Sequence, residues 1–167
     1  MQIKTYSDWS IYLEKYANGE DAVLEIIQNG VFELDAGTTL RFYEKIQNTY
    51  IARKKSIFDK FNRELGITSA KSNNDFIIIF RNLNNLLLGL NNFVQVKVIP
   101  EDLKKILVDD YTQYIDDLKS RFTKVFNNNF EVLSSVKSLG MPKQTILQSQ
   151  EGANEENKQT NTRKIIF

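Results

Sequence analysis

The sequence contains no cysteine and no histidine among its 167 residues. Without cysteine the chain has no disulfide framework, no thiolate nucleophile and no cysteine-based zinc or iron–sulfur site. Histidine is the commonest general base near neutral pH and a frequent metal ligand, so its absence excludes Ser-His-Asp triads and zinc sites of the HExxH type. The two absences together argue against the best-known catalytic centres, and the lack of disulfides fits a reducing compartment.

Proline, glycine and long hydrophobic runs are also scarce, with 2 prolines and 7 glycines in the chain. A β-sandwich or barrel needs turn residues at about every 8–12 positions, so this scarcity favours helices. The most apolar region, 76–90, contains Arg81 and several asparagines and is shorter than the roughly 20 residues of a membrane span. The N-terminus has acidic residues within its apolar part and does not resemble a secretory signal. We therefore expect a soluble protein that is cytoplasmic or belongs to a virion or similar assembly.

Apolar side chains recur at three- and four-residue steps over most of the chain, which indicates amphipathic helices. Residues 7–29 predict two short helices separated by an Asn-Gly pair. A long helix is expected over 36–65 with Gly66 as its C-cap, and another over 74–94. The run FIIIF at 76–80 could instead form a strand, and a change from helix to strand near FVQVKVI stays open.

The last long helix is expected to begin at Pro100, because proline suits the first helical turn. Its apolar positions repeat every seven residues like the seam of a coiled coil, at Tyr111, Leu118, Val125, Val132 and Leu139. This pattern could extend the helix to about Leu139, with a bend or break at the three asparagines of 127–129. Gly140 and Pro142 are expected to stop it.

These patterns predict an all-α fold, an elongated antiparallel bundle of three long helices preceded by two short helices. Residues 1–139 form the bundle domain, and Trp9 is expected to anchor the first helix on it. Residues 140–167 are expected to be a disordered polar tail that ends in a short apolar peptide.

Basic residues gather on the 36–65 helix, although the formal net charge of the whole chain is only +1. Six of them fall on the arc of the helix opposite the apolar stripe. These six are Arg41, Lys45, Arg53, Lys55, Lys60 and Arg63. Because a long helix needs a solvated face, the arc has a purely structural explanation. It could also bind nucleic-acid phosphates, an anionic membrane or complementary charges on a protein.

The densest group of carboxylates is the stretch DDYTQYIDD at 109–117. Asp109 and Asp116 are seven residues apart, as are Asp110 and Asp117, so each pair shares a helix face. Aspartate-rich magnesium sites use the closer DDxxD spacing, so we interpret this stretch as a solvated polar surface. No glycine-rich phosphate loop occurs in the chain. We expect no catalytic residues, no cofactor and no bound metal.

The tail contains a short apolar peptide, RKIIF, in which Arg163 and Lys164 precede Ile165, Ile166 and Phe167. A flexible tether of about 20 residues would place this peptide some 25 Å from the bundle by random-coil scaling. There it could add a strand to a sheet edge or fill an apolar pocket. The alternative is that these apolar residues have no binding function. These five residues are the predicted partner-binding site.

The leading functional hypothesis is a non-enzymatic structural or adaptor subunit of a larger protein assembly. It would dock through the bundle surface and the C-terminal peptide, either on copies of itself or on other subunits. The alternatives are a nucleic-acid-associated subunit of a nucleoprotein complex and a module that binds anionic membranes, both acting through the basic arc. No stretch of the chain carries a motif specific enough to assign a family.

Overall fold

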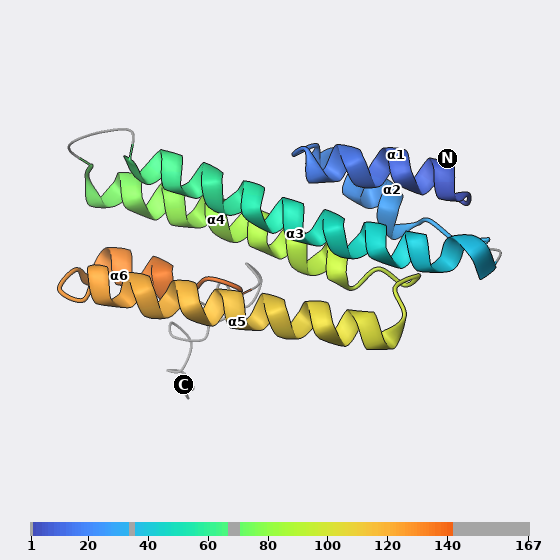
Figure 1. Cartoon of the computed structure of the whole chain (residues 1–167). Coiled ribbons are helices and arrows are strands. Elements are labelled where there is room, and N and C mark those ends of the chain that lie inside the picture. The colour runs from blue at the N-terminus through green and yellow to red at the C-terminus, as the bar shows by residue number, and fades with distance from the viewer. Residues whose placement is uncertain (1, 34–35, 67–70, 142–167) are drawn as a thin grey trace, which may run out of the picture.

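The computed structural model describes residues 2–33, 36–66 and 71–141. Within these ranges the fold is all-α, as predicted, and contains no strand (Figure 1). The elements in chain order are α1 (Tyr6–Ala17), the 3-10 turn η1 (Asp21–Val23), α2 (Leu24–Gln28), α3 (Ala36–Gly66), α4 (Asn73–Val94), α5 (Glu101–Val125) and α6 (Phe130–Lys137). The run FIIIF lies inside α4, so its interpretation as a strand is wrong.

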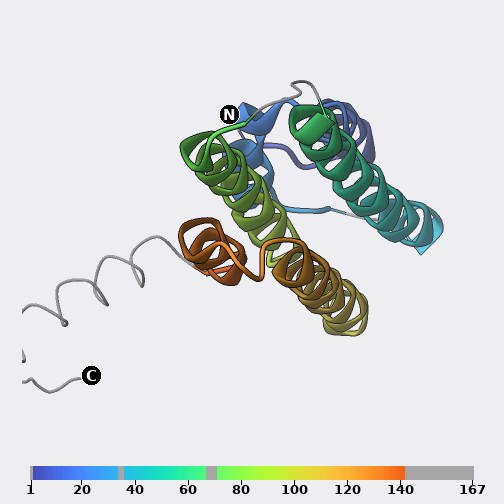
Figure 2. The ribbon, with the colours of Figure 1, turned by 90° about the vertical axis from the view of Figure 1, so that its left-hand side faces the viewer.

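The long helices α3, α4 and α5 run antiparallel to their neighbours in the chain and form an elongated bundle (Figure 1). With 31 residues, α3 is about 46 Å long at a rise of 1.5 Å per residue. The helix α4 lies at the centre and contacts α2, α3, α5 and α6, while α1 packs along α3 (Figure 2). The predicted bundle with two short helices in front of it is thus confirmed.

Trp9 anchors α1 on the bundle, as the sequence predicted. Its side chain is fully buried, its ring centroid lies 5.1 Å from that of Phe42 on α3, and its indole nitrogen donates a hydrogen bond of 2.7 Å to the Val31 carbonyl. Gly30 makes this packing possible, since a Cβ atom there would lie 2.5 Å from the indole ring. Thr5 begins α1 through a capping box with Asp8, whose backbone hydrogen bonds lower the pKa of its carboxyl group.

The helix α4 begins earlier than the sequence pattern indicated. Ser72 is its N-cap and forms a capping box with Asp75, so the first helical residue is Asn73. At its other end, Val94 is followed by turns in which Val96 and Ile99 are buried. The possible change to strand near FVQVKVI is therefore wrong as well.

The expected helix from Pro100 to about Leu139 is in fact two helices. The helix α5 ends at Val125, the chain turns at the three asparagines, and α6 folds back beside α5 and α4 (Figure 2). Asn129 caps α6 by accepting a hydrogen bond from the Val132 amide, and its own amide donates a bond of 2.8 Å to the side chain of Asn73. Since the chain reverses here, the seven-residue repeat does not form one continuous seam.

Phenylalanine rings fill the end of the bundle where α3, α4 and α5 meet. Phe80 lies at the centre of this aromatic cluster, with ring centroids 5.3 Å from Phe61, 5.5 Å from Phe122 and 5.7 Å from Phe126. The ring of Phe76 stands edge-on to Phe126 at 5.0 Å. Edge-to-face rings at such distances add to the stabilisation that burial itself provides.

Candidate functional site

The most exposed large apolar side chain in the described part of the chain belongs to Phe130, at the first position of α6. It leaves 85% of its surface accessible, although Val132 and Val136 on the opposite face of the same helix are fully buried. The helix is thus held against α4 by one face and presents an aromatic ring to solvent on the other. Single exposed apolar side chains are common on protein surfaces, so Phe130 is a candidate contact only together with the surface beside it.

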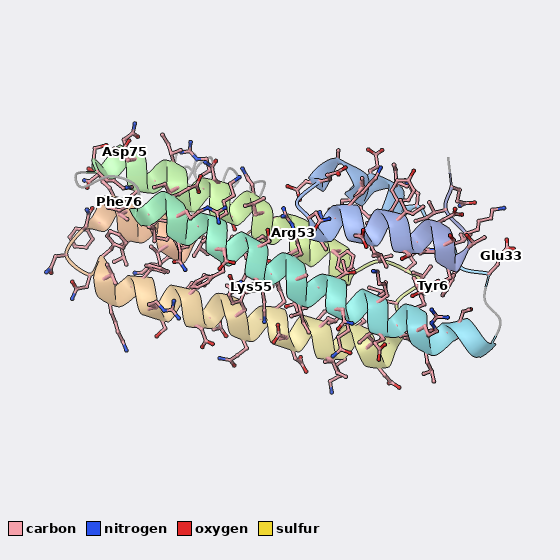
Figure 3. The ribbon with its side chains drawn as sticks, turned by 45° about the horizontal axis from the view of Figure 1, so that its top comes forward. Tyr6, Glu33, Arg53, Lys55, Asp75 and Phe76 are labelled. Carbon is pink, nitrogen blue, oxygen red and sulfur yellow. The ribbon has the colours of Figure 1, made fainter. Side chains whose placement is uncertain are left out.

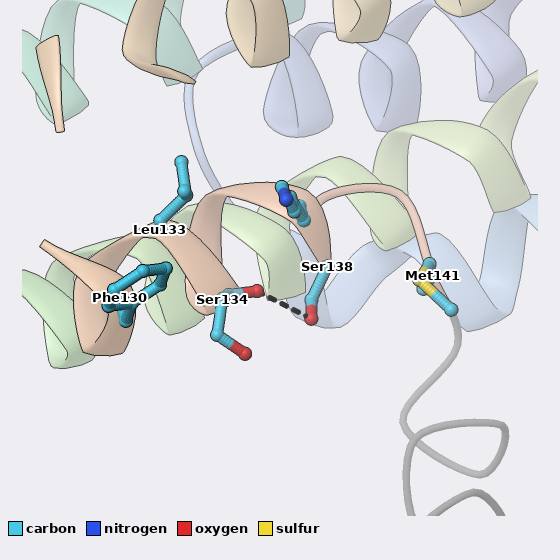
Figure 4. Close-up of a pocket in the computed structure, with 6 residues that line it drawn as sticks. Phe130, Leu133, Ser134, Ser138 and Met141 are labelled. Carbon is cyan, nitrogen blue, oxygen red and sulfur yellow. Dashed lines mark hydrogen bonds between the residues drawn. The ribbon is translucent and has the colours of Figure 1, made fainter. Parts of the chain in front are cut away.

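A shallow depression of about 350 Å³ runs along α6 beside this ring (Figure 4). It is lined by Phe130, Leu133, Ser134, Lys137, Ser138 and Met141. The Ser138 hydroxyl donates a hydrogen bond of 2.9 Å to the Ser134 carbonyl, so this hydroxyl hydrogen is already engaged. The lining therefore combines three apolar side chains, Phe130, Leu133 and Met141, with two serines and the cation of Lys137.

A second depression of about 200 Å³ lies between α5 and the residues that follow α6. Met141 lines both depressions, so that the two adjoin at this side chain. The lining of the second one includes the apolar side chains of Ile115 and Leu139 and two charged side chains, the carboxylate of Asp116 and the ammonium of Lys119. Apolar contact and charges of both signs thus lie at adjacent positions. We call the pair the Met141 depressions.

Two hydrogen bonds from Asn84 on α4 hold the chain in place at this point. Its amide donates to the Met141 carbonyl at 3.1 Å, and its side-chain oxygen accepts from the Gly140 amide at 2.7 Å. Gly140 has a φ of +84°, and a Cβ atom there would lie 2.9 Å from the side chain of Ile115. The first two residues of the predicted tail are therefore fixed to the bundle. Residues 142–167, including Arg163, Lys164, Ile165, Ile166 and Phe167, lie outside the described residues.

Three of the six bases on the predicted basic arc contact the N-terminal segment, although Arg41 is also exposed to solvent and Lys45 is half-buried. The Arg41 guanidinium lies 5.2 Å from the Tyr6 ring, and the Lys45 ammonium is 3.9 Å from the Glu14 carboxylate. Arg53 forms a 2.6 Å ion pair with Asp21 where α3 passes the end of α1 (Figure 3). The excess of acids in the N-terminal segment thus neutralises part of the basic arc within the same chain.

Arg53 departs most from the expectation of a solvated face, because only 5% of its surface is exposed. Its guanidinium also lies 5.4 Å from the ring of Tyr16, and its Nε atom has no hydrogen-bond partner among the described residues. Burial raises the pKa of the Tyr16 hydroxyl, and the positive charge of Arg53 opposes that increase. A buried cation with one paired carboxylate is a structural contact between α1 and α3, and it cannot reach a phosphate in solution.

The other three bases lie on the C-terminal half of α3. All three are exposed, although Lys55 also forms a 2.8 Å ion pair with Asp59, one helical turn away. The accessible part of the basic arc is therefore this segment together with Arg41, which lies apart from it near the start of α3. Each exposed charge of this kind contributes only weak, salt-sensitive attraction to an anionic partner.

One carboxylate of the 109–117 stretch has a role that sequence reasoning missed. Asp110 accepts hydrogen bonds of 2.7 Å from both Tyr50 and Lys54, and so joins α5 to α3. Desolvation alone would raise the pKa of Asp110, but the hydrogen bonds from Lys54 and Tyr50 outweigh it and lower the pKa. Only a three-dimensional structure could separate this residue from its exposed neighbours Asp109, Asp116 and Asp117.

Neither a metal centre nor a membrane span is found within the described ranges. No group of three or more acidic residues there is arranged to hold a metal ion. None of the helices is both long enough and apolar enough to cross a bilayer.

The fold and the site define a helical bundle that carries a partly apolar surface beside the start of its tail. Comparison with known proteins gave no match, whether to a protein-family model, to a curated protein or to a solved structure. What the chain does must therefore be inferred from its own residues.

Proposed function

We propose that this chain is a non-enzymatic helical adaptor or structural subunit that binds a partner protein through the Met141 depressions. The observation that supports this most directly is the 85% exposure of Phe130 at the edge of a 350 Å³ depression. Aromatic side chains near the centre of an interface often contribute a large share of the binding free energy. The five residues Arg163–Phe167 remain the proposed second contact.

The alternative in which the chain binds nucleic acid or an anionic membrane has less support. Of the six bases on the predicted arc, Arg53 is buried and Lys45 lies against a carboxylate of α1. Of the exposed bases, Lys55 is paired with Asp59 and Arg41 lies apart from Lys60 and Arg63, so we expect only weak electrostatic binding. A protein partner requires no excess of one charge and fits the apolar side chains of the depressions better.

The proposal is tested by capture with the full-length chain as bait. We expect wild type to retain a partner that the Phe130→Asp variant loses, with affinity reduced about 30-fold or more, since an aromatic anchor is worth about 2 kcal/mol. An aspartate in the first turn of α6 suits the helix dipole, so the variant should fold normally. The matched control is Leu40→Asp on α3, because Leu40 is 77% exposed and distant in sequence from α6.

Equal capture by wild type and both variants would contradict a partner site on α6. The same three proteins should then be titrated with single- and double-stranded DNA and RNA and with anionic vesicles. Binding that disappears with added salt and with Lys60→Glu and Arg63→Glu would instead support the basic arc.

A further inference from the structure

The exposed face of α6 carries both a protruding aromatic ring and a depression. Phe130 and Met141 lie at opposite ends of the larger depression, with Ser134 and Ser138 between them (Figure 4). Phe130 is the first residue of α6 and Lys137 is the last, so about 10 Å along the helix separate them at a rise of 1.5 Å per residue. A ring and a place for a ring are thus two turns apart on one short helix.

The lining of this depression favours an aromatic side chain as its occupant. It includes the ammonium group of Lys137 and the thioether of Met141 beside the apolar Leu133. A cation attracts the face of an aromatic ring, and a thioether sulfur makes favourable contacts with the edge of a ring. A cavity of about 150 Å³ accommodates a benzene ring in another protein, so a depression of about 350 Å³ has room for one phenylalanine side chain.

The described part of the chain offers one ring for this role. Its other aromatic side chains are buried or half-buried, and Phe130 alone is exposed. Phe130 forms the near end of the depression on its own helix, two turns before Lys137, so it cannot also lie across the far end. The ring that enters beside Lys137 and Met141 must therefore come from another molecule, and a second copy of this chain presents one.

An antiparallel pair of α6 helices would let both copies exchange rings at once. In that arrangement the start of each helix lies beside the end of the other, so each Phe130 reaches the end of the partner depression that Lys137 lines. The exposed carboxylate of Glu131, in the first turn, then lies at the level of the exposed ammonium of Lys137 in the other copy. Opposite charges and opposed helix dipoles favour this direction over a parallel pair, which would align like charges.

We propose that the partner bound at the Met141 depressions is a second copy of this chain. The two α6 helices pack antiparallel about a two-fold axis near Ser134, and each Phe130 ring fills the larger depression of the other copy. The inference rests on the proposed function, because it names the partner of the same site. Since α6 has only 8 residues, the interface is small, and the dimer is expected to be weak and to form at high protein concentration.

The mass of the full-length chain, measured by sedimentation equilibrium, tests the dimer directly. Between about 1 μM and 1 mM protein, wild type should rise from the mass of a monomer towards that of a dimer. Phe130→Asp should remain monomeric over this range, and the matched control Leu40→Asp should dimerise like wild type. Phe130→Leu keeps an apolar side chain but loses the ring, so its dissociation constant should rise about 3- to 10-fold.

Single thiols test the direction of the pair, and the absence of cysteine makes each introduced thiol unique. Ser134→Cys lies near the proposed axis and should give a disulfide-linked dimer on oxidation with diamide. Ser138→Cys, on the same face one turn further along, lies too far from its counterpart, because a disulfide requires Cα atoms within about 7 Å. It should therefore stay monomeric under the same conditions. Linking of both thiols would indicate a parallel pair and would overturn the proposed arrangement.

A full-length chain that stays monomeric at every concentration, or a dimer that Phe130→Asp leaves unchanged, would refute the inference. These failures are distinguishable from failure of the proposed function. If the chain is monomeric but captures a different protein that Phe130→Asp loses, the inference fails and the proposed function stands. If Phe130→Asp changes neither self-association nor capture, both fail.

Discussion

Where α1 packs on α3, charged contacts of Arg53 and Lys45 accompany the buried rings of Trp9 and Phe42. Where α3, α4 and α5 meet at the far end, phenylalanine rings pack on one another. The first region includes the pair Arg53–Asp21 and the approach of Lys45 to Glu14. The second has Phe80 in contact with three other rings. Partly exposed ion pairs contribute little stability, while buried aromatic rings contribute several kcal/mol. We therefore expect loss of a ring from the aromatic cluster to cost more stability than loss of one of these ion pairs.

The largest effect should follow from breaking the aromatic cluster. Phe80 is 1% exposed, so Phe80→Ala should lower the free energy of unfolding by about 3–5 kcal/mol, since it leaves a cavity and removes three ring contacts. Urea denaturation followed by circular dichroism measures this loss. The control is Phe130→Ala, which should change stability by less than about 0.5 kcal/mol because the side chain is already in solvent.

Breaking the charged contact should have a smaller and more local effect. Asp21→Asn leaves the buried Arg53 without its carboxylate, and we expect a loss of about 1–2 kcal/mol because Asp21 is itself 54% exposed. Hydrogen exchange should increase at the amides of α1 and remain unchanged in α5. The variant Arg53→Met should lose less than Asp21→Asn, since it removes the charge itself. A greater loss in Arg53→Met would show that packing of the guanidinium outweighs its charge.

Two buried tyrosines show how much one hydrogen bond contributes to stability, because they differ in whether the hydroxyl has a partner. The Tyr111 hydroxyl donates a bond of 3.0 Å to the Leu87 carbonyl, whereas the Tyr16 hydroxyl has no partner among the described residues. Tyr111→Phe should therefore reduce stability by about 1 kcal/mol at neutral pH, and Tyr16→Phe should be close to neutral. Equal losses in the two variants, measured by urea denaturation, would contradict this assignment.

Tyr111 also predicts that the protein loses stability at alkaline pH. Burial raises the pKa of Tyr111 from 10.0 to about 12. Since the unfolded chain ionises first, the contribution of this residue is complete below pH 10 and is lost as the pH rises towards 12. Wild type should thus lose more stability over this interval than Tyr111→Phe does.

The smallest effect is expected at the polar contact between α3 and α5. Asp110 has a lowered pKa, so it stabilises the fold above its ordinary pKa of 3.8 and loses this effect as the pH falls through its folded value. Because the carboxylate is 45% exposed, water screens it, and Asp110→Asn should cost less than about 1 kcal/mol at neutral pH. The difference between wild type and variant should vanish at strongly acidic pH. The matched control is Asp109→Asn, whose carboxylate is exposed on α5.

Much of the helical architecture was predictable because its signals are local. The stripes of apolar residues along α3 and α4 indicated both helices to within a few residues of their observed ends. The predicted start of α4 at residue 74 is one residue later than the observed start at Asn73, which the capping box of Ser72 and Asp75 defines. Closer attention to the spacing of these two residues would have placed it correctly.

The reversal between α5 and α6 could not be decided from the repeat alone. Apolar residues at seven-residue intervals suit one long seam and equally suit two helices that pack on a common neighbour. Here α4 is that neighbour, since Val132 and Leu139 are buried although Val125 is 63% exposed. The lining of the first depression, from Phe130 to Met141, instead follows the spacing of one helical face and could have been found from the sequence. The sequence could not show that the opposite face of α6 packs on α4 and leaves this face exposed.

The sequence by itself determined that this protein is helical, where α3 and α4 lie and which residue types it lacks, because composition and periodicity act within a few residues. Only the tertiary structure decided that Arg53 lies under α1 and that Asp110 binds α3. It also decided that Asn84 holds Met141 beside the depression along α6. Burial and pairing of a charge depend on which helix covers it, and this follows from the packing of residues that are far apart in the chain.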